Sequence, residues 1–210
     1  MKQGTQRLAS GRRKLVSRTD AAAAMLLSAL AAAVTTALAV HRISSYLSGP
    51  VTLTLPLSSP QISPTGLAPG TQAYYSSVEA TVPSVPQPEA ALLAWGDALN
   101  QTGTLAALAL IFLLASRLRR DVLFTAGSAL VIGTCGTVLA LAGSAGQVLD
   151  TMACTRLAED IGANGNADTE YPLFVGTFSM APLVAGLALI LVAGVFEYGR
   201  RLQKDAEGLV

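Results

Sequence analysis

Four long stretches of the chain contain no charged residue and are rich in Ala, Leu, Val and Gly. They are residues 21–40, 98–116, 122–149 and 171–196, which are 20, 19, 28 and 26 residues long. A helix needs about 20 mainly apolar residues to cross roughly 30 Å of hydrocarbon, because it rises about 1.5 Å per residue. The pattern therefore predicts an all-α membrane protein with four transmembrane helices in a bundle.

The chain between the first two apolar stretches has a different character. Eight of the ten prolines lie from Pro50 to Pro88 among many Ser and Thr, and proline disrupts a helix, so this is not a further span. Two runs, 51–55 and 74–82, alternate apolar and polar residues, which is typical of strands with one buried face. We expect a small β-containing loop there, packed on the helix ends or on the other outer loop. Trp95, just before the second stretch, is expected to be an interfacial anchor.

The charges are distributed unevenly along the chain. Twelve of the 14 Lys and Arg lie before the first stretch, between the second and third, or after the fourth. The other two intervals hold two basic and eight acidic residues. Basic flanks are retained in the cytoplasm. We therefore expect a protein of the cell membrane with both termini in the cytoplasm.

These expectations divide the chain into nine segments. They are a basic cytoplasmic leader (1–20), a first span (21–40), an extracytoplasmic loop (41–97), a second span (98–116), a cytoplasmic link (117–121), a third span (122–148), an extracytoplasmic loop (149–171), a fourth span (172–196) and a cytoplasmic tail (197–210). Alternatively, the first stretch is a secretory signal cleaved after Ala37-Leu38-Ala39. Signal cores run about 7–15 residues, so the 20-residue stretch favours a retained helix.

The composition excludes several classes of protein. Apolar residues make up 51% of the chain and charged residues 13%, about half the charged share of a soluble domain. An ordinary soluble enzyme, a disordered chain and a nucleic-acid binder are therefore poor fits, and no direct nucleic-acid binding is expected. Ion-coupled transporters usually place ionisable groups at membrane depth. The four stretches carry no Asp, Glu, Lys, Arg or His, which argues against this class.

Few residues suit catalysis or metal binding. His41 is the only histidine. A histidine-based zinc site would therefore lack a second imidazole ligand, and a Ser-His-Asp triad would have no spare imidazole. The acidic run from Asp160 to Glu170 resembles a calcium loop, but Gly162 and Tyr171 stand where an EF-hand needs oxygen ligands. A solvated acidic turn is the favoured interpretation. We expect no enzymatic activity, no cofactor and no metal.

Small residues recur at helical spacing in the third stretch. They are Ala129, Gly133, Gly136, Thr137 and Ala140. Such spacing lets helix backbones approach closely. The residues form either the contact face of a homo-oligomer or a packing face within the bundle, and the second is favoured because four spans already need internal faces. In the fourth stretch, Pro182 predicts a bend in the helix.

The C-terminal run Phe196-Glu197-Tyr198-Gly199-Arg200-Arg201-Leu202, followed by acidic residues and the terminal Leu209-Val210, resembles the end of a bacterial four-span membrane family known as domain of unknown function 2975. Asp121–Thr125 resembles the family's Pro-Phe-Thr motif, with Leu123 in place of the proline. The resemblance covers Leu92 to Val210. Family members have no assigned enzymatic activity, and many are encoded beside a small helix-turn-helix regulator. The resemblance thus implies a membrane-bound partner or sensor for such a regulator.

The tail has the composition of a docking segment. Phe196, Gly199, Leu202 and Leu209 are the candidate docking residues, and they lie among basic and acidic neighbours. The alternative is a helix end anchored at the lipid headgroups. The sequence therefore favours a non-enzymatic accessory or regulatory membrane component with the lipid bilayer and a cytoplasmic regulator as partners. A small transporter, or a structural subunit of a larger membrane complex, is the alternative.

Overall fold

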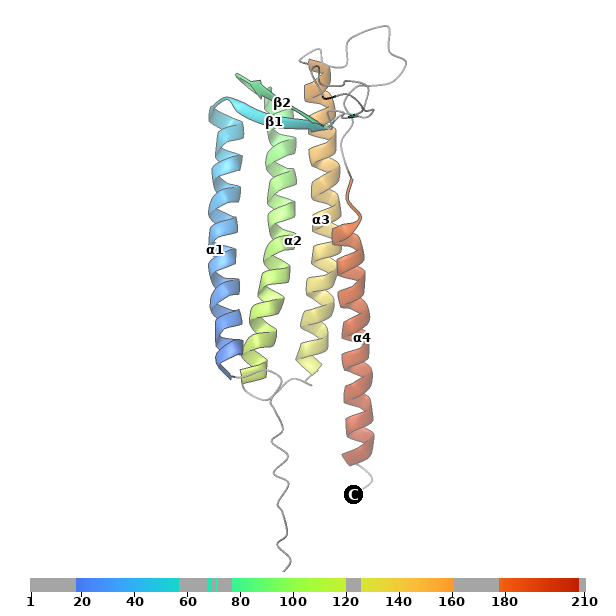
Figure 1. Cartoon of the computed structure of the whole chain (residues 1–210). Coiled ribbons are helices and arrows are strands. Elements are labelled where there is room, and N and C mark those ends of the chain that lie inside the picture. The colour runs from blue at the N-terminus through green and yellow to red at the C-terminus, as the bar shows by residue number, and fades with distance from the viewer. Residues whose placement is uncertain are drawn as a thin grey trace, which may run out of the picture.

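A computed structural model of the chain describes residues 18–56, 68, 71, 77–119, 126–160 and 178–207. Four helices and two strands occur in this part (Figure 1). In chain order they are α1 (Arg18–Ser48), β1 (Val51–Pro56), β2 (Ser77–Val82), α2 (Gln87–Arg119), α3 (Ala126–Asp160) and α4 (Ala181–Glu207). Each helix contains a segment long and apolar enough to cross a membrane. The prediction of four apolar helices with a small β element between the first two is confirmed.

The four helices lie side by side and pack in sequence order. In the described part of the chain, extensive contact joins α1 to α2, α2 to α3 and α3 to α4. Figure 1 shows α1 and α4 at opposite edges of this row. The bundle is therefore open, and many large apolar side chains stay exposed; Leu26, Leu130 and Leu191 are 73%, 69% and 73% exposed. In a bilayer, acyl chains cover such side chains at no hydrophobic penalty.

The first three helices are longer than a membrane requires. They have 31, 33 and 35 residues, and about 20 suffice. The extra turns lie mainly beside the strands, so segments 41–97 and 149–171 contain helix as well as loop. We call the end of the bundle beside β1 and β2 the hairpin end. The opposite end, where α2 stops at Arg119 and α3 starts at Ala126, is the link end. Trp95 near the hairpin end is 67% exposed.

The two strands form an antiparallel pair across the helix ends (Figure 1). Val51 of β1 lies opposite Val82 of β2. Val51 and Leu53 are buried while Thr52 and Thr54 are exposed, as the period-two alternation predicts. The buried side chains share a core cluster with residues from two helices. Its members are Val51, Leu53, Val82, Leu93, Ala153 and Leu157, with Tyr46, Val85 and Leu92 packed against them.

Helix α4 starts at Ala181, so Pro182 lies in its first turn. The prediction that Pro182 bends the fourth helix is wrong, because a proline in the first turn removes no intrahelical hydrogen bond. Two hydrogen bonds of Ser179 stabilise the start of α4. The N–H of Ser179 donates to Oε1 of Gln147 (2.6 Å), and its hydroxyl accepts from the N–H of Ala181 (3.2 Å). The expected span began at residue 172, and residues 172–177 lie outside the described part.

Candidate functional site

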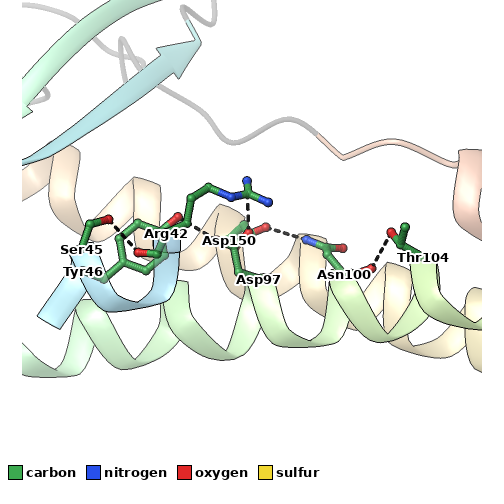
Figure 2. A network of polar contacts seen from close by, with 7 residues as sticks. All are labelled: Arg42, Ser45, Tyr46, Asp97, Asn100, Thr104 and Asp150. Atoms are coloured by element: carbon green, nitrogen blue, oxygen red, sulfur yellow. Dashed lines mark hydrogen bonds and ion pairs between the residues drawn. The ribbon is translucent and has the colours of Figure 1, made fainter. Parts of the chain in front are cut away.

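Polar side chains from three helices meet at the hairpin end (Figure 2). This outer polar cluster comprises Arg42 and Tyr46 of α1, Asp97 and Asn100 of α2, and Asp150 of α3. Asp97 immediately precedes a charge-free stretch and Asp150 immediately follows one. The ends of the apolar stretches therefore place these groups at similar depth on neighbouring antiparallel helices.

Asp97 ties α1 to α2. Its side chain is 9% exposed, accepts a hydrogen bond from the hydroxyl of Tyr46 (2.8 Å) and lies 3.4 Å from Nη1 of Arg42. The Arg42 side chain is 59% exposed, so solvent screens the ion pair and its contribution to stability is small. Solvent screens the hydrogen bond from Tyr46 less, because both Tyr46 and Asp97 are at least partly buried.

Asn100 and Asp150 tie α2 to α3. Nδ2 of Asn100 donates to Oδ2 of Asp150 at 2.8 Å. Each of these side chains also fills the space beside a glycine of the opposite helix: Asp150 lies against Gly96, and Asn100 lies against Gly146. The two glycines let the helices approach closely enough for the polar side chains to meet.

A further polar contact joins α1 to α2 within the apolar stretches. Nε2 of Gln101 donates to the hydroxyls of Thr35 (3.1 Å) and Thr36 (3.0 Å). Amide groups act as interhelical glue in lipid, because an unpaired amide there has no water to bond. The sequence analysis missed Asn100 and Gln101. Their signal was present, as two adjacent amides at the start of an otherwise apolar stretch.

The composition of the outer polar cluster suits a structural clamp. Two carboxylates stand against one guanidinium, so the cluster has an excess of negative charge. Within the described residues, no group of three His, Cys, Asp or Glu side chains could hold a metal ion. Tyr46 both packs on the core cluster under the strands and donates to Asp97. The outer polar cluster thereby couples the position of the paired strands to the packing of α1, α2 and α3.

Glu89 is a second buried carboxylate at the hairpin end. It lies in the first turn of α2 and is 7% exposed. Its Oε2 has no hydrogen-bond partner among the residues the structure describes. The free N–H groups and the dipole of a helix N-terminus favour a carboxylate at such a position.

The small residues of the third stretch lie partly against α4. A Cβ on Gly133 would be 3.5 Å from that of Ala193, and one on Gly136 would be 2.8 Å from the carbonyl oxygen of Gly186. A Cβ on Gly186 would be 2.6 Å from that of Ala140. Thr137, in contrast, is exposed, and its hydroxyl donates to the carbonyl of Gly133 (2.9 Å). Ala129 is half-buried.

Helix α4 continues past the link end of its neighbours (Figure 1). Ala193 faces Gly133, and α3 starts seven residues before Gly133, so an antiparallel α4 passes the start of α3 near Arg200. The residues from 201 to 207 add about 10 Å of helix beyond that level. We call residues 196–207, which are the last turn of α4 beside α3 together with this overhang, the α4 extension.

The α4 extension has polar and apolar faces. Glu197 accepts hydrogen bonds from Arg200 (2.6 Å) and Arg201 (3.5 Å). Tyr198 and Leu202, one turn apart, are 66% and 53% exposed. The sequence analysis named Leu202 as a candidate docking residue but did not consider Tyr198, although the i, i+4 spacing of the two was visible.

Other candidate docking residues are less accessible or not described. Phe196 and Gly199 are half-buried. Leu209 and the acidic run after Asp160 lie outside the described residues. Cys135 and Cys154 are both free thiols.

Comparison of the chain with protein-family models, with curated proteins and with solved structures found no match. The resemblance of the C-terminal half to domain of unknown function 2975 therefore stays a prediction from the residues quoted above.

Proposed function

We propose that the protein is a non-enzymatic accessory or regulatory component of the cell membrane whose α4 extension binds a cytoplasmic protein. The observation that carries this proposal is that α4 passes the link end (Figure 1), with Tyr198 and Leu202 exposed close to the level at which α3 starts. The partner class that the family resemblance implies is a small helix-turn-helix regulator.

The charges favour a cytoplasmic link end. Arg117 and Arg119 lie in the last turn of α2, and Arg200 and Arg201 lie on the α4 extension at the same end. Basic residues close to membrane spans are retained in the cytoplasm. The hairpin and the outer polar cluster are then extracytoplasmic.

The α4 extension has the properties of a preformed docking helix. Ion pairs from Glu197 to Arg200 and Arg201, at i, i+3 and i, i+4, favour the helical state. Tyr198 and Leu202 offer one apolar face to a groove on a partner. Burial of a Leu side chain contributes about 1.5–3 kcal/mol, so this pair can dominate a small interface.

Affinity purification of the tagged full-length protein from its native membrane tests the proposal. In the double variant Tyr198→Ser/Leu202→Ser, the recovery of a co-purifying cytoplasmic protein should fall more than tenfold. Tyr198→Phe/Leu202→Met, which keeps the apolar volume, should retain it. Equal recovery with both variants would overturn the proposal, as would the absence of any stoichiometric cytoplasmic protein from the wild-type sample.

The second candidate is a structural subunit of a larger membrane complex, and the open row of helices favours it. The row carries many exposed apolar side chains that neighbouring integral subunits could cover. Co-purification of integral proteins that is unaffected by the changes at Tyr198 and Leu202 would favour this candidate. For transport we find less support. A polar cavity lined by hydroxyls such as those of Thr134 and Thr137 would be needed, but both hydroxyls donate to backbone carbonyls of α3 itself.

A further inference from the structure

A groove of about 380 Å³ lies between α1 and α2 in the half of the bundle nearer the link end. It is more than twice the volume of a cavity of about 150 Å³ that accepts benzene. Its wall on α1 is made of the small residues Ser28, Ala29 and Ala32, and its wall on α2 is made mainly of large apolar ones, with Ala109 among them. The difference in side-chain size across the interface creates the groove.

The lining is apolar although one hydroxyl contributes to it. Ser28 is 5% exposed, and its hydroxyl donates to the carbonyl of Met25 (3.0 Å). Its one hydrogen-bond donor is therefore used within α1, and the groove offers a ligand mainly dispersion contacts. Phe112 and Leu113 on the opposite wall are 37% and 36% exposed, so the groove is open to the surrounding lipid.

A basic residue lies beyond the groove toward the link end. Arg119 follows Phe112 by seven residues, which places it on the same face of α2 about 10 Å further along. Its side chain is exposed. Arg117 points elsewhere, because its guanidinium donates to the hydroxyl of Ser128 on α3. An acyl chain in the groove would thus have a guanidinium close to its headgroup.

We propose that this groove binds one acyl chain of an anionic phospholipid whose phosphate group contacts Arg119. The apolar lining and the opening to lipid select an acyl chain, and the charge of Arg119 selects an anionic headgroup. In a bilayer there is no hydrophobic gain for leaving bulk lipid. Retention therefore depends on the fit of the chain between the two walls and on the ion pair at the headgroup.

Native mass spectrometry can test for the bound lipid. The full-length protein is reconstituted in vesicles of equal parts phosphatidylglycerol and phosphatidylethanolamine and then extracted in mild detergent. The wild type should retain one phospholipid, with phosphatidylglycerol enriched at least threefold. Ala29→Leu/Ala32→Leu fills the groove from α1 and should reduce retention at least tenfold. The matched control is Ala23→Leu, which is exposed and lies half a turn round from Ala32 on α1.

Two further results decide the proposal. Arg119→Gln should retain a lipid but lose the preference for phosphatidylglycerol, whereas Arg201→Gln, at an exposed basic residue of α4, should keep that preference. Thermal unfolding of each variant confirms that it is folded; if the double Leu variant is unstable, Ala32→Leu alone replaces it. Lipid-free wild type, or equal retention by the groove-filling variant and Ala23→Leu, would overturn the proposal. An unchanged headgroup preference in Arg119→Gln would overturn the assignment of the phosphate contact.

Discussion

Asp150 of α3 lies directly against Gly96 of α2, with its carboxylate in the space where a Cβ on Gly96 would stand. One turn further along α2, Asn100 lies in the same way against Gly146 of α3. The two side chains are joined by a hydrogen bond of 2.8 Å. Each helix thus supplies one glycine and one polar side chain, and the pairing fixes the antiparallel register of α2 and α3.

Gly96→Ala should therefore destabilise the protein. The added methyl group would collide with the carboxylate of Asp150, and overpacking of this kind costs about 1–3 kcal/mol. Gly194→Ala is the matched control, because nothing lies within 4 Å of its Cβ position, and helix propensity favours Ala over Gly by about 1 kcal/mol. Thermal unfolding in detergent, followed by the fluorescence of the single Trp, should show a lower Tm only for Gly96→Ala. Equal Tm values would show that Asp150 moves away freely.

The hydroxyl of Tyr46 should stabilise the hairpin end. Tyr46→Phe keeps the packing on the core cluster but removes the hydrogen bond to the buried Asp97. Loss of a hydrogen bond to a charged group costs about 1.5–3 kcal/mol. Tyr198→Phe, at a residue that is 66% exposed, should leave stability unchanged. The contrary result, equal unfolding free energies for the two variants, would show that water replaces Tyr46 at Asp97.

The helices and strands followed from local patterns in the sequence. The length of an uncharged stretch measures whether a helix can cross the hydrocarbon, so the four helices could be predicted without knowledge of their neighbours. Alternation likewise predicted that Val51 and Leu53 are buried while Thr52 and Thr54 are exposed. Both signals depend only on residues close together in the chain.

The contacts between helices did not follow from such patterns. The sequence analysis placed Asp97 and Asp150 in the loop segments. Their proximity to one another could not be predicted, because it depends on the register of α2 against α3. The stripe with Gly133 and Gly136 fitted either α4 or a second copy for the same reason. The start of α4 was more predictable: Ser179 shortly before Pro182 is a capping signal that the apolar pattern concealed.

The expected orientation can be measured with single cysteines on a background without Cys135 and Cys154. Positions 10 and 203 should be shielded from an impermeant thiol reagent in intact cells, because the basic flanks keep both termini in the cytoplasm. Positions 66 and 164, in the two outer loops, should react. Permeabilised cells serve as the control, in which all four positions should label. Reaction of position 203 in intact cells would reverse the assigned orientation and remove the basis for a cytoplasmic partner.

The packing of α3 on α4 within one chain can be separated from packing between two chains by a disulfide. The Cβ positions of Gly133 and Ala193 are 3.5 Å apart, which is within the range of a disulfide. On a background without native cysteines, Gly133→Cys/Ala193→Cys should therefore form an internal bond and stay monomeric on a non-reducing gel.

The neighbouring pair Gly133→Cys/Gly194→Cys is the matched control for this bond. It should remain reduced, because nothing lies within 4 Å of the Cβ position of Gly194. Covalent dimers formed by the Gly133→Cys/Ala193→Cys variant would instead assign the small residues around Gly133 to a contact between two copies. In that case α4 would belong to an oligomer interface, and the exposure of its apolar residues would need to be reassessed in the assembled protein.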